Sequence, residues 1–310
     1  MHQVRWSRHR ARLVREVVLG QESGIFRTET LDHRRAGGQF LTPHNVCRGL
    51  AQAGAPPRFS RRCGPGTRQR LQAARVADGS DRRQEIQRQG LALFVSGCEY
   101  ARDLTAPPAA LQGGAVFLRR DALRRWLWDK IEIWGVRKAD GALKAALECY
   151  GFAADAEQGL ESMSEQEAET LILHELGEAM AEPLLGPAWR ELIASFTGRR
   201  AEILARAVRD NLADCLSTLP RLVERNAACS IHFYFASFEG VRSKLFPLLA
   251  QAYRDWRDCG SLVPLRDAAR AGSVHWHEAA QRLLRVHQGD PAAAEQTIAA
   301  WIEDPAELVL

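Results

Sequence analysis

Apolar residues recur at helical spacing through most of the chain after Arg120, and this pattern limits the possible fold more than any other feature. Residues at i, i+3, i+4 and i+7 share one face of an α-helix, so such a stripe predicts a helix buried on one side. The pattern favours a mainly α-helical protein whose helical, bundle-like body covers residues 120–310. The first stripe, with Asp121 as its expected cap, consists of Leu123, Trp126, Leu127, Ile131 and Trp134.

The next helix is predicted from its capping signals. Ser164 and Glu167 have the Ser-x-x-Glu spacing of a capping box, which predicts that a helix carrying His174 begins here. Pro183 marks its expected end, because proline cannot donate a backbone hydrogen bond inside a helix. Further helices are predicted for residues 187–193, 199–219 (ended or kinked at Pro220), 230–256 (kinked at Pro247), 274–287 and 291–303.

A small β element is predicted just before the helical body, over residues 91–119. Residues 91–95 and 115–118 are short apolar runs with the length and composition of buried strands. The segment between them contains prolines and glycines and is too long for a tight hairpin, so the pattern leaves their pairing open.

Residues 1–90 lack the periodicity that indicates folding. They are rich in arginine, glycine, alanine and proline without a regular spacing, which predicts an irregular basic leader. Two explanations compete: a disordered tail, or a stretch that is out of frame in a GC-rich gene. An unbroken natural reading frame through codons 1–90 would rule out the second. The expected organisation is therefore a leader over 1–90, a β element over 91–119 and a helical domain over 120–310.

The net charge of +4 conceals a difference between the two parts of the chain. Residues 1–90 carry 18 arginines, no lysine and 7 acidic residues, a balance of +11, whereas the rest carries 24 basic and 31 acidic residues, a balance of −7. A basic arm is one way to bind nucleic acid. However, the arginines are dispersed and no recognition helix or stacking pattern accompanies them. Nucleic-acid binding through the leader is therefore the least favoured of the alternative functions, and the sequence names no other partner.

Several observations bear on location. No apolar run reaches the roughly 18 residues typical of a membrane span, and the basic N-terminus is not followed by the apolar core of a secretory signal. The chain has seven cysteines, an odd number, and no Cys-x-x-Cys pair. The simplest interpretation is a cytoplasmic protein with free thiols and no membrane partner.

Four segments resemble an uncharacterised proteobacterial protein family. They are VSGCEYARDLTAPPAALQGG (95–114), LILHELGEA (171–179), RAVRDNLADCLSTLP (206–220) and IHFYFASFEG (231–240). The resemblance covers roughly 90–285. It does not extend into residues 1–90, where the family has an ordinary folded N-terminal half, and this difference favours the frame-error explanation. The family has no assigned activity, so the resemblance implies no mechanism.

Two helical segments place metal-type ligands four residues apart, namely His174 with Glu178 and Asp210 with Asp214. Such pairs lie on one helix face, so two adjacent helices can bring an imidazole and three carboxylates together. His174-Glu-x-x-Glu178 lacks the second histidine of a zinc-peptidase helix. Carboxylate-rich sites for Fe, Mn or Zn are the better comparison, and His232 on the next segment is a further candidate ligand.

The alternative is a buried polar network without a metal. Asp214 lies within an apolar stripe, and a buried carboxylate requires a partner. That partner can be Arg206, Arg209 or His174. We take a non-catalytic helical protein with such a network as the default interpretation and a protein that binds a divalent metal, or a metal-dependent enzyme, as the alternative. No catalytic residue, organic cofactor or activity follows from the sequence.

Overall fold

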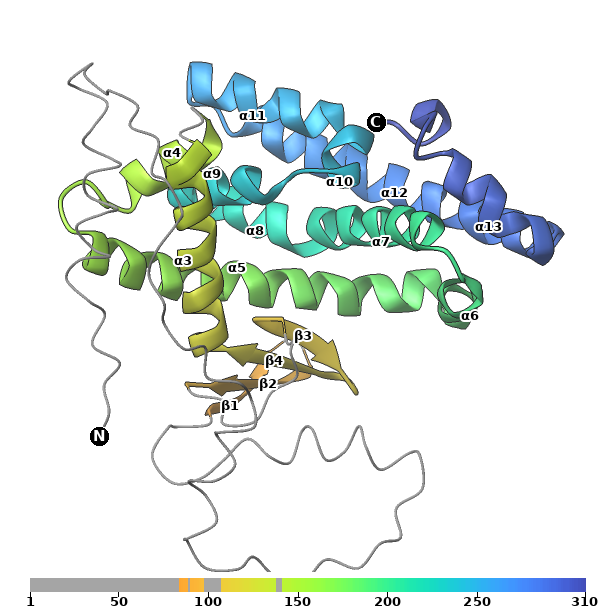
Figure 1. Ribbon diagram of the computed structural model, residues 1–310, viewed down its shortest axis with the longest axis horizontal. Helices are drawn as coiled ribbons and strands as arrows, with labels where there is room; N and C mark the ends of the chain where they lie inside the picture. Colours follow the sequence, from red (N-terminus) through yellow and green to blue (C-terminus); the bar gives the residue numbers. More distant parts are fainter. Residues whose placement is uncertain (1–83, 89, 98–106, 138–140) are drawn as a thin grey trace, which may run out of the picture. The chain divides into compact units, whose positions relative to one another are not determined.

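The computed structural model describes residues 84–88, 90–97, 107–137 and 141–310, all within one compact unit (Figure 1). The helical body is confirmed, so the protein is mainly α-helical with a small sheet before the helices. Most of the basic leader predicted for residues 1–90 lies outside the described residues. Among the described residues, no helix is long and apolar enough to span a membrane.

The sheet in the described part of the chain has four strands, in the order β1-β2-β4-β3. β2 (Leu91–Ser96) and β4 (Ala115–Arg119) are the two predicted strands, and they pair in parallel. β1 (Gln84–Arg88) and β3 (Ala109–Gln112) were not predicted, and each pairs antiparallel with one of the two central strands. The connection that looked too long for a hairpin thus contains an edge strand.

Buried and partly buried side chains alternate along the two central strands, so the sheet has one face that is more deeply buried than the other. Leu93 pairs with Val116 and Val95 with Leu118, and all four side chains are buried. The helices α3 (Arg120–Arg137) and α5 (Ala156–Leu185) contact the sheet. On α3, Leu123, Leu127 and Ile131 of the predicted stripe are buried at spacings of four residues, and Trp126 is partly buried. The short α4 (Ala142–Cys149) follows.

The long helix α5 begins earlier and ends later than predicted. Its cap is Asp155, whose side chain accepts hydrogen bonds from the backbone N–H groups of Glu157 and Gln158 at 2.9 and 3.0 Å. Ser164 therefore lies inside the helix, and its hydroxyl donates to the carbonyl of Leu160 instead of capping. Pro183 lies in the last turn without ending the helix.

The predicted helix 199–219 is an α-helix followed by a π-helical turn. α6 (Pro187–Ser195) leads to α7 (Arg199–Ala213), whose chain continues through the π-helix η2 (Asp214–Thr218) into α8 (Leu219–Glu224). Pro220 is in the first turn of α8, a position that tolerates proline, and the helical path continues through it without ending. π-helical turns inside longer helices are rare and often occur at functional sites.

The predicted long helix over 230–256 is wrong. The segment forms three helices, α9 (Ala228–Ser237), α10 (Val241–Leu245) and α11 (Pro247–Cys259). Gly240, with φ of 68°, separates the first two in a backbone conformation that favours glycine. The chain then forms α12 (Val263–Gly289), α13 (Pro291–Ala300) and the 3₁₀ turn η3 (Pro305–Glu307). α12 begins well before the predicted residue 274.

The expectation of free thiols is wrong for two of the cysteines. Cys149, at the end of α4, forms a disulfide with Cys229, in the first turn of α9, and their Cα atoms are 5.3 Å apart. Among the described cysteines, Cys215 is free and buried and Cys259 is free and exposed. The two disulfide cysteines are 80 residues apart in the chain, so no local spacing could indicate the pair.

Candidate functional site

Two helices approach each other closely enough to bring the predicted site residues together. α5 lies against α7 and η2 (Figure 1). At Gly177 the approach is so close that an added Cβ atom would lie 2.2 Å from the carbonyl oxygen of Ala213. Glycine is therefore required at this position. His174 and Glu178 flank Gly177 on one helix and Asp210 and Asp214 flank Ala213 on the other, so all four come into one charged cluster.

Asp214 is the centre of this cluster and is 2% exposed. Its Oδ1 atom accepts hydrogen bonds from His174 Nδ1 at 2.8 Å and from the Thr218 hydroxyl at 2.9 Å. Its Oδ2 atom accepts from the Tyr234 hydroxyl at 2.9 Å and from the guanidinium group of Arg242. Four protein donors, from α5, η2, α9 and α10, thus occupy the two carboxylate oxygens.

Arg242 is the partner of Asp214 that sequence reasoning missed. Its Nε atom also donates to Asn211 Oδ1 at 3.2 Å, and its guanidinium lies over the Phe238 ring at 5.5 Å. Of the predicted partners, His174 is correct, but Arg206 pairs with Glu202 instead. Arg242 lies 28 residues beyond Asp214 and is placed by the α9–α10 connection, so no local pattern could have indicated it.

The charges around Asp214 stabilise one another. Burial alone would raise the pKa of Asp214, but Arg242 and His174 outweigh it and hold that pKa well below its usual range. For His174, burial alone would lower the pKa, and the Asp214 carboxylate beside it raises the pKa well above its usual value. The Asp214 carboxylate therefore favours the protonated, positively charged form of the His174 imidazole. The pKa of Tyr234 is raised by burial and by the same carboxylate.

The outer part of the cluster contains Glu178, Asp210 and Arg209. The Arg209 guanidinium donates to Glu178 Oε1 at 2.6 Å and to Asp210 Oδ1 at 2.9 Å. His174 Nε2 lies 3.6 Å from Glu178 Oε1. One ligand atom each from His174, Glu178 and Asp210 lies within 4.8 Å of the others. The three side chains are 22, 17 and 23% exposed, so solvent and ions reach this part of the cluster.

His232 is the predicted site residue that the structure places elsewhere. Its Nδ1 atom forms a hydrogen bond with the Tyr253 hydroxyl at 2.8 Å, and its ring lies 4.9 Å from that of Trp256. Burial and the nearby Arg257 lower its pKa. His232 thus packs against α11 as a partly buried histidine.

Comparison with known proteins places this cluster in a family domain. Residues 124–305 match the model described as the C-terminal domain of a family of unknown function (DUF6866), and they make up more than half of the chain. The chain belongs to this family. No curated protein and no solved structure matches it. No activity can be assigned from the family, in agreement with the sequence interpretation.

All members of the charged cluster lie inside the DUF6866 domain, as does a second buried cluster that sequence reasoning missed. Glu167 on α5 is 1% exposed, and its Oε1 atom accepts a hydrogen bond from the Tyr150 hydroxyl at 2.5 Å. Ser230 lies 3.2 Å from the same hydroxyl. Burial raises the pKa of Glu167 to about 7. Tyr150 and Ser230 directly follow the two disulfide cysteines, so the disulfide holds both residues near Glu167.

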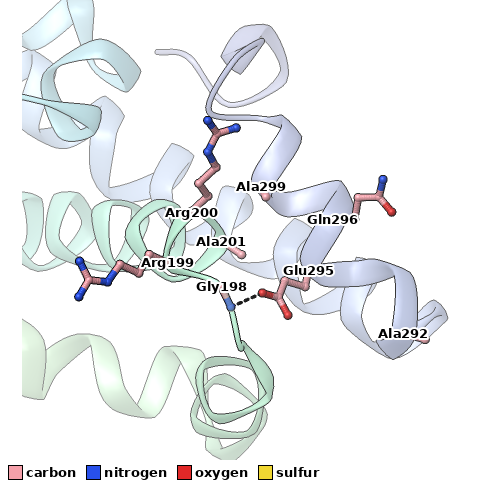
Figure 2. A pocket seen from close by; sticks show the side chains of 8 residues that line it. All are labelled: Gly198, Arg199, Arg200, Ala201, Ala292, Glu295, Gln296 and Ala299. Atoms are coloured by element: carbon pink, nitrogen blue, oxygen red, sulfur yellow. Dashed lines mark hydrogen bonds between the residues drawn. The ribbon is translucent and has the colours of Figure 1, made fainter.

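A shallow pocket of about 400 Å³ lies between the start of α7 and α13 of the DUF6866 domain (Figure 2). Its central feature is Glu295, whose carboxylate accepts hydrogen bonds from the N–H groups of Thr197 and Gly198. These bonds lower the pKa of Glu295. The Glu295 carboxylate on α13 thus binds the backbone just before α7 begins, and none of the predicted site residues lines this pocket.

Proposed function

We propose that the protein is a non-catalytic helical protein and that the inner half of its charged cluster, centred on Asp214, is part of the fold. Its role in the cell is then structural or that of a binding partner. The support comes from Asp214. An ionised carboxylate offers about four acceptor positions. Donors from four different elements take these positions, which leaves none directed at a substrate or a metal.

The unfolding free energy of an Asp214→Asn variant tests this proposal. The substitution leaves the Arg242 guanidinium without its anion. It also turns the new NH2 group, which is itself a donor, towards protein donors from which it cannot accept a hydrogen bond. We expect the variant to lose roughly 3 kcal/mol of unfolding free energy, as when one partner of a buried ion pair is removed. Urea unfolding of the full chain, followed by circular dichroism, measures it. Asp210→Asn, a partly exposed residue four positions earlier, is the matched control and should change stability by less than about 1 kcal/mol.

An Asp214→Asn protein as stable as the parent, or more stable, would mean that Asp214 is kept for activity, because replacing functional residues often leaves stability unchanged or increases it. Thr218→Val keeps the experiment informative if Asp214→Asn does not fold. It removes one of the four donors while preserving the shape of the side chain, so we expect a loss of about 1 kcal/mol. A Thr218→Val protein as stable as the parent would contradict the proposal.

We also propose the finer features of the family resemblance. The blocks 171–179, 206–220 and 231–240 lie within the matched range 124–305, and the block 95–114 precedes it. We infer that all four are characteristic of the family and that the family is proteobacterial. A survey of proteomes for chains that carry all four blocks tests this, and a majority of such chains outside the Proteobacteria would refute it.

A cytoplasmic location is a further proposal. It is supported by Cys215 and Cys259, which remain free thiols among the described residues. The Cys149–Cys229 disulfide argues against it, because disulfides are uncommon in the reducing cytosol. Fractionation of source cells, with the protein detected by antibody, shows whether the protein is cytoplasmic. Its recovery outside the cytoplasmic fraction would refute the proposal.

A further inference from the structure

We propose that His174, Glu178 and Asp210 form a binding site for a divalent transition-metal cation such as Mn²⁺, Fe²⁺ or Zn²⁺. The Arg209 guanidinium now lies between the two carboxylates of this site. The site is the outer half of the charged cluster. It uses atoms that do not bond to Asp214, so it does not require Asp214 as a ligand and goes beyond the structural role proposed for that residue.

The first argument is how His174 uses its two ring nitrogens. Nδ1 forms a hydrogen bond with Asp214 Oδ1 at 2.8 Å, and the neutral tautomer with its proton on Nδ1 leaves a lone pair on Nε2. Metal-binding histidines usually donate their other ring N–H to a carboxylate, which fixes the ring and makes the ligand nitrogen more basic. Asp214 is held in place by Thr218, Tyr234 and Arg242, so it fixes the imidazole rigidly.

The second argument is the distance between the ligand atoms. Nε2 of His174 lies 3.6 Å from Glu178 Oε1, and a ligand atom of Asp210 lies within 4.8 Å of both residues. Two atoms that each bind one ion at about 2.0–2.2 Å lie roughly 3–4 Å apart. Small rotations of the carboxylates therefore bring all three groups onto one ion. One imidazole and two carboxylates form a ligand set suited to Mn, Fe or Zn.

The third argument is charge. Four carboxylates interact in this part of the cluster, those of Glu175, Glu178, Asp210 and Asp214. Among the described residues, the guanidinium groups of Arg209 and Arg242 and the protonated imidazole of His174 offset three of these charges. A partly buried excess of negative charge attracts a cation. The Arg209 guanidinium already neutralises part of this negative charge through its hydrogen bonds with Glu178 and Asp210. It is also 28% exposed, so its side chain can turn outward when a divalent ion takes its place.

Mn²⁺ binding to the full-length, chelator-treated protein tests the proposal. The EPR signal of free Mn²⁺ falls when the ion is bound, so a titration gives both affinity and stoichiometry. We expect one ion per chain in the parent. Arg209→Gln should bind at least about tenfold more tightly, because the competing cation is gone and the site is more negative by one charge. His174→Ala and Asp210→Asn should each weaken binding by at least about tenfold.

Glu182→Gln is the matched control. Glu182 lies one turn beyond Glu178 on α5, is exposed and pairs with Arg190, so its replacement removes the same charge outside the site and should leave affinity within about twofold. Absence of Mn²⁺ binding in both the parent and Arg209→Gln would overturn the proposal, as would equal affinity in Asp210→Asn and the parent. Asp210 is partly exposed, so this variant remains informative if His174→Ala does not fold. Failure of Mn²⁺ binding leaves the Asp214→Asn unfolding result unaffected.

Discussion

At Glu167, burial places an ionisable group where its charge is costly. Glu167 is 1% exposed, and its Oε2 atom has no hydrogen-bond partner among the residues that the structure describes. Its pKa rises from 4.5 to about 7. Because the folded protein holds this proton more tightly than the unfolded chain, the associated stability is complete below pH 4.5 and is lost as the pH rises to about 7. The difference corresponds to about 3 kcal/mol.

Glu167→Gln should remove this dependence. The amide keeps the shape of the protonated carboxyl group and never ionises, so we expect the variant to gain stability relative to the parent as the pH rises from 4.5 to 7. Urea unfolding at a series of pH values measures the difference between the two proteins. Glu165→Gln, at an exposed position of the same helix, is the control for the change in charge. A parallel pH dependence for Glu167→Gln and the parent would show that Glu167 is ionised in the folded state without cost.

The residues of the charged cluster illustrate which contacts a sequence can reveal. His174, Glu178, Asp210 and Asp214 were identified because spacing of four residues fixes a common helix face. Their partner Arg242 was not, because its position depends on how α9 and α10 pack, and no local rule encodes that packing. His232 failed to join them for the same reason: its helix directs it towards Tyr253 and Trp256 instead.

At the scale of elements, the close packing of α5 against α7 depends on Gly177. An added methyl group there would lie 2.2 Å from a backbone carbonyl oxygen, which cannot rotate away as a side chain can. To make room for this methyl group, α5 and α7 must move apart. The contacts of His174 and Glu178 with the facing helix must then lengthen. The charged cluster therefore depends on the absence of a side chain at this one position.

Gly177→Ala should lower the unfolding free energy by at least about 1–3 kcal/mol, the usual cost of overpacking, despite the better helix propensity of alanine. Gly289→Ala is the matched control, because Gly289 is also helical and has no atom within 4 Å of its added Cβ. We expect that control to be neutral or slightly stabilising in thermal unfolding. A Gly177→Ala protein as stable as Gly289→Ala would show that the helices are not in close contact.

Element type followed from the sequence more reliably than element boundaries. β2 and β4 were correct because they are short apolar runs bounded by turn residues, and α3 was correct because its apolar residues recur at helical spacing. The start of α5 was wrong because Ser164 has the capping-box spacing, yet Asp155 caps the helix and Ser164 bonds to a carbonyl within it. The helix over 230–256 was wrong because its apolar residues are continuous, and the break depends on Gly240 at positive φ. The edge strand β3 carries too few residues to be distinguished from a loop.

At the scale of the whole molecule, the disulfide links parts of the chain that are far apart in sequence. Cys149 and Cys229 enclose a loop that includes α5, α6, α7, η2 and α8, and thus most of the charged cluster. A cross-link over so many residues restricts the unfolded chain strongly. The described part of the domain is therefore stabilised as a unit and not through a single helix pair.

Replacing both cysteines, Cys149→Ser with Cys229→Ser, should lower the unfolding free energy by about 2–4 kcal/mol. The loss should equal the effect of a thiol reductant on the parent, and the reductant should have no further effect on the double variant. Urea unfolding with and without reductant measures both. Cys259→Ser, at an exposed free cysteine, is the control. An unchanged midpoint in the reduced parent would show that the cross-link does not contribute to stability.

The donors around Asp214 also determine when the packing around this residue can be completed during translation. His174 emerges before Asp214, whereas Tyr234 and Arg242 emerge after it. Nascent chains fold from their N-terminal side as synthesis proceeds. Until α10 has been translated, the Asp214 carboxylate on η2 lacks the Arg242 guanidinium that compensates its charge. The hydrogen bonds that fix Asp214 between these elements are therefore complete only once residue 242 is available.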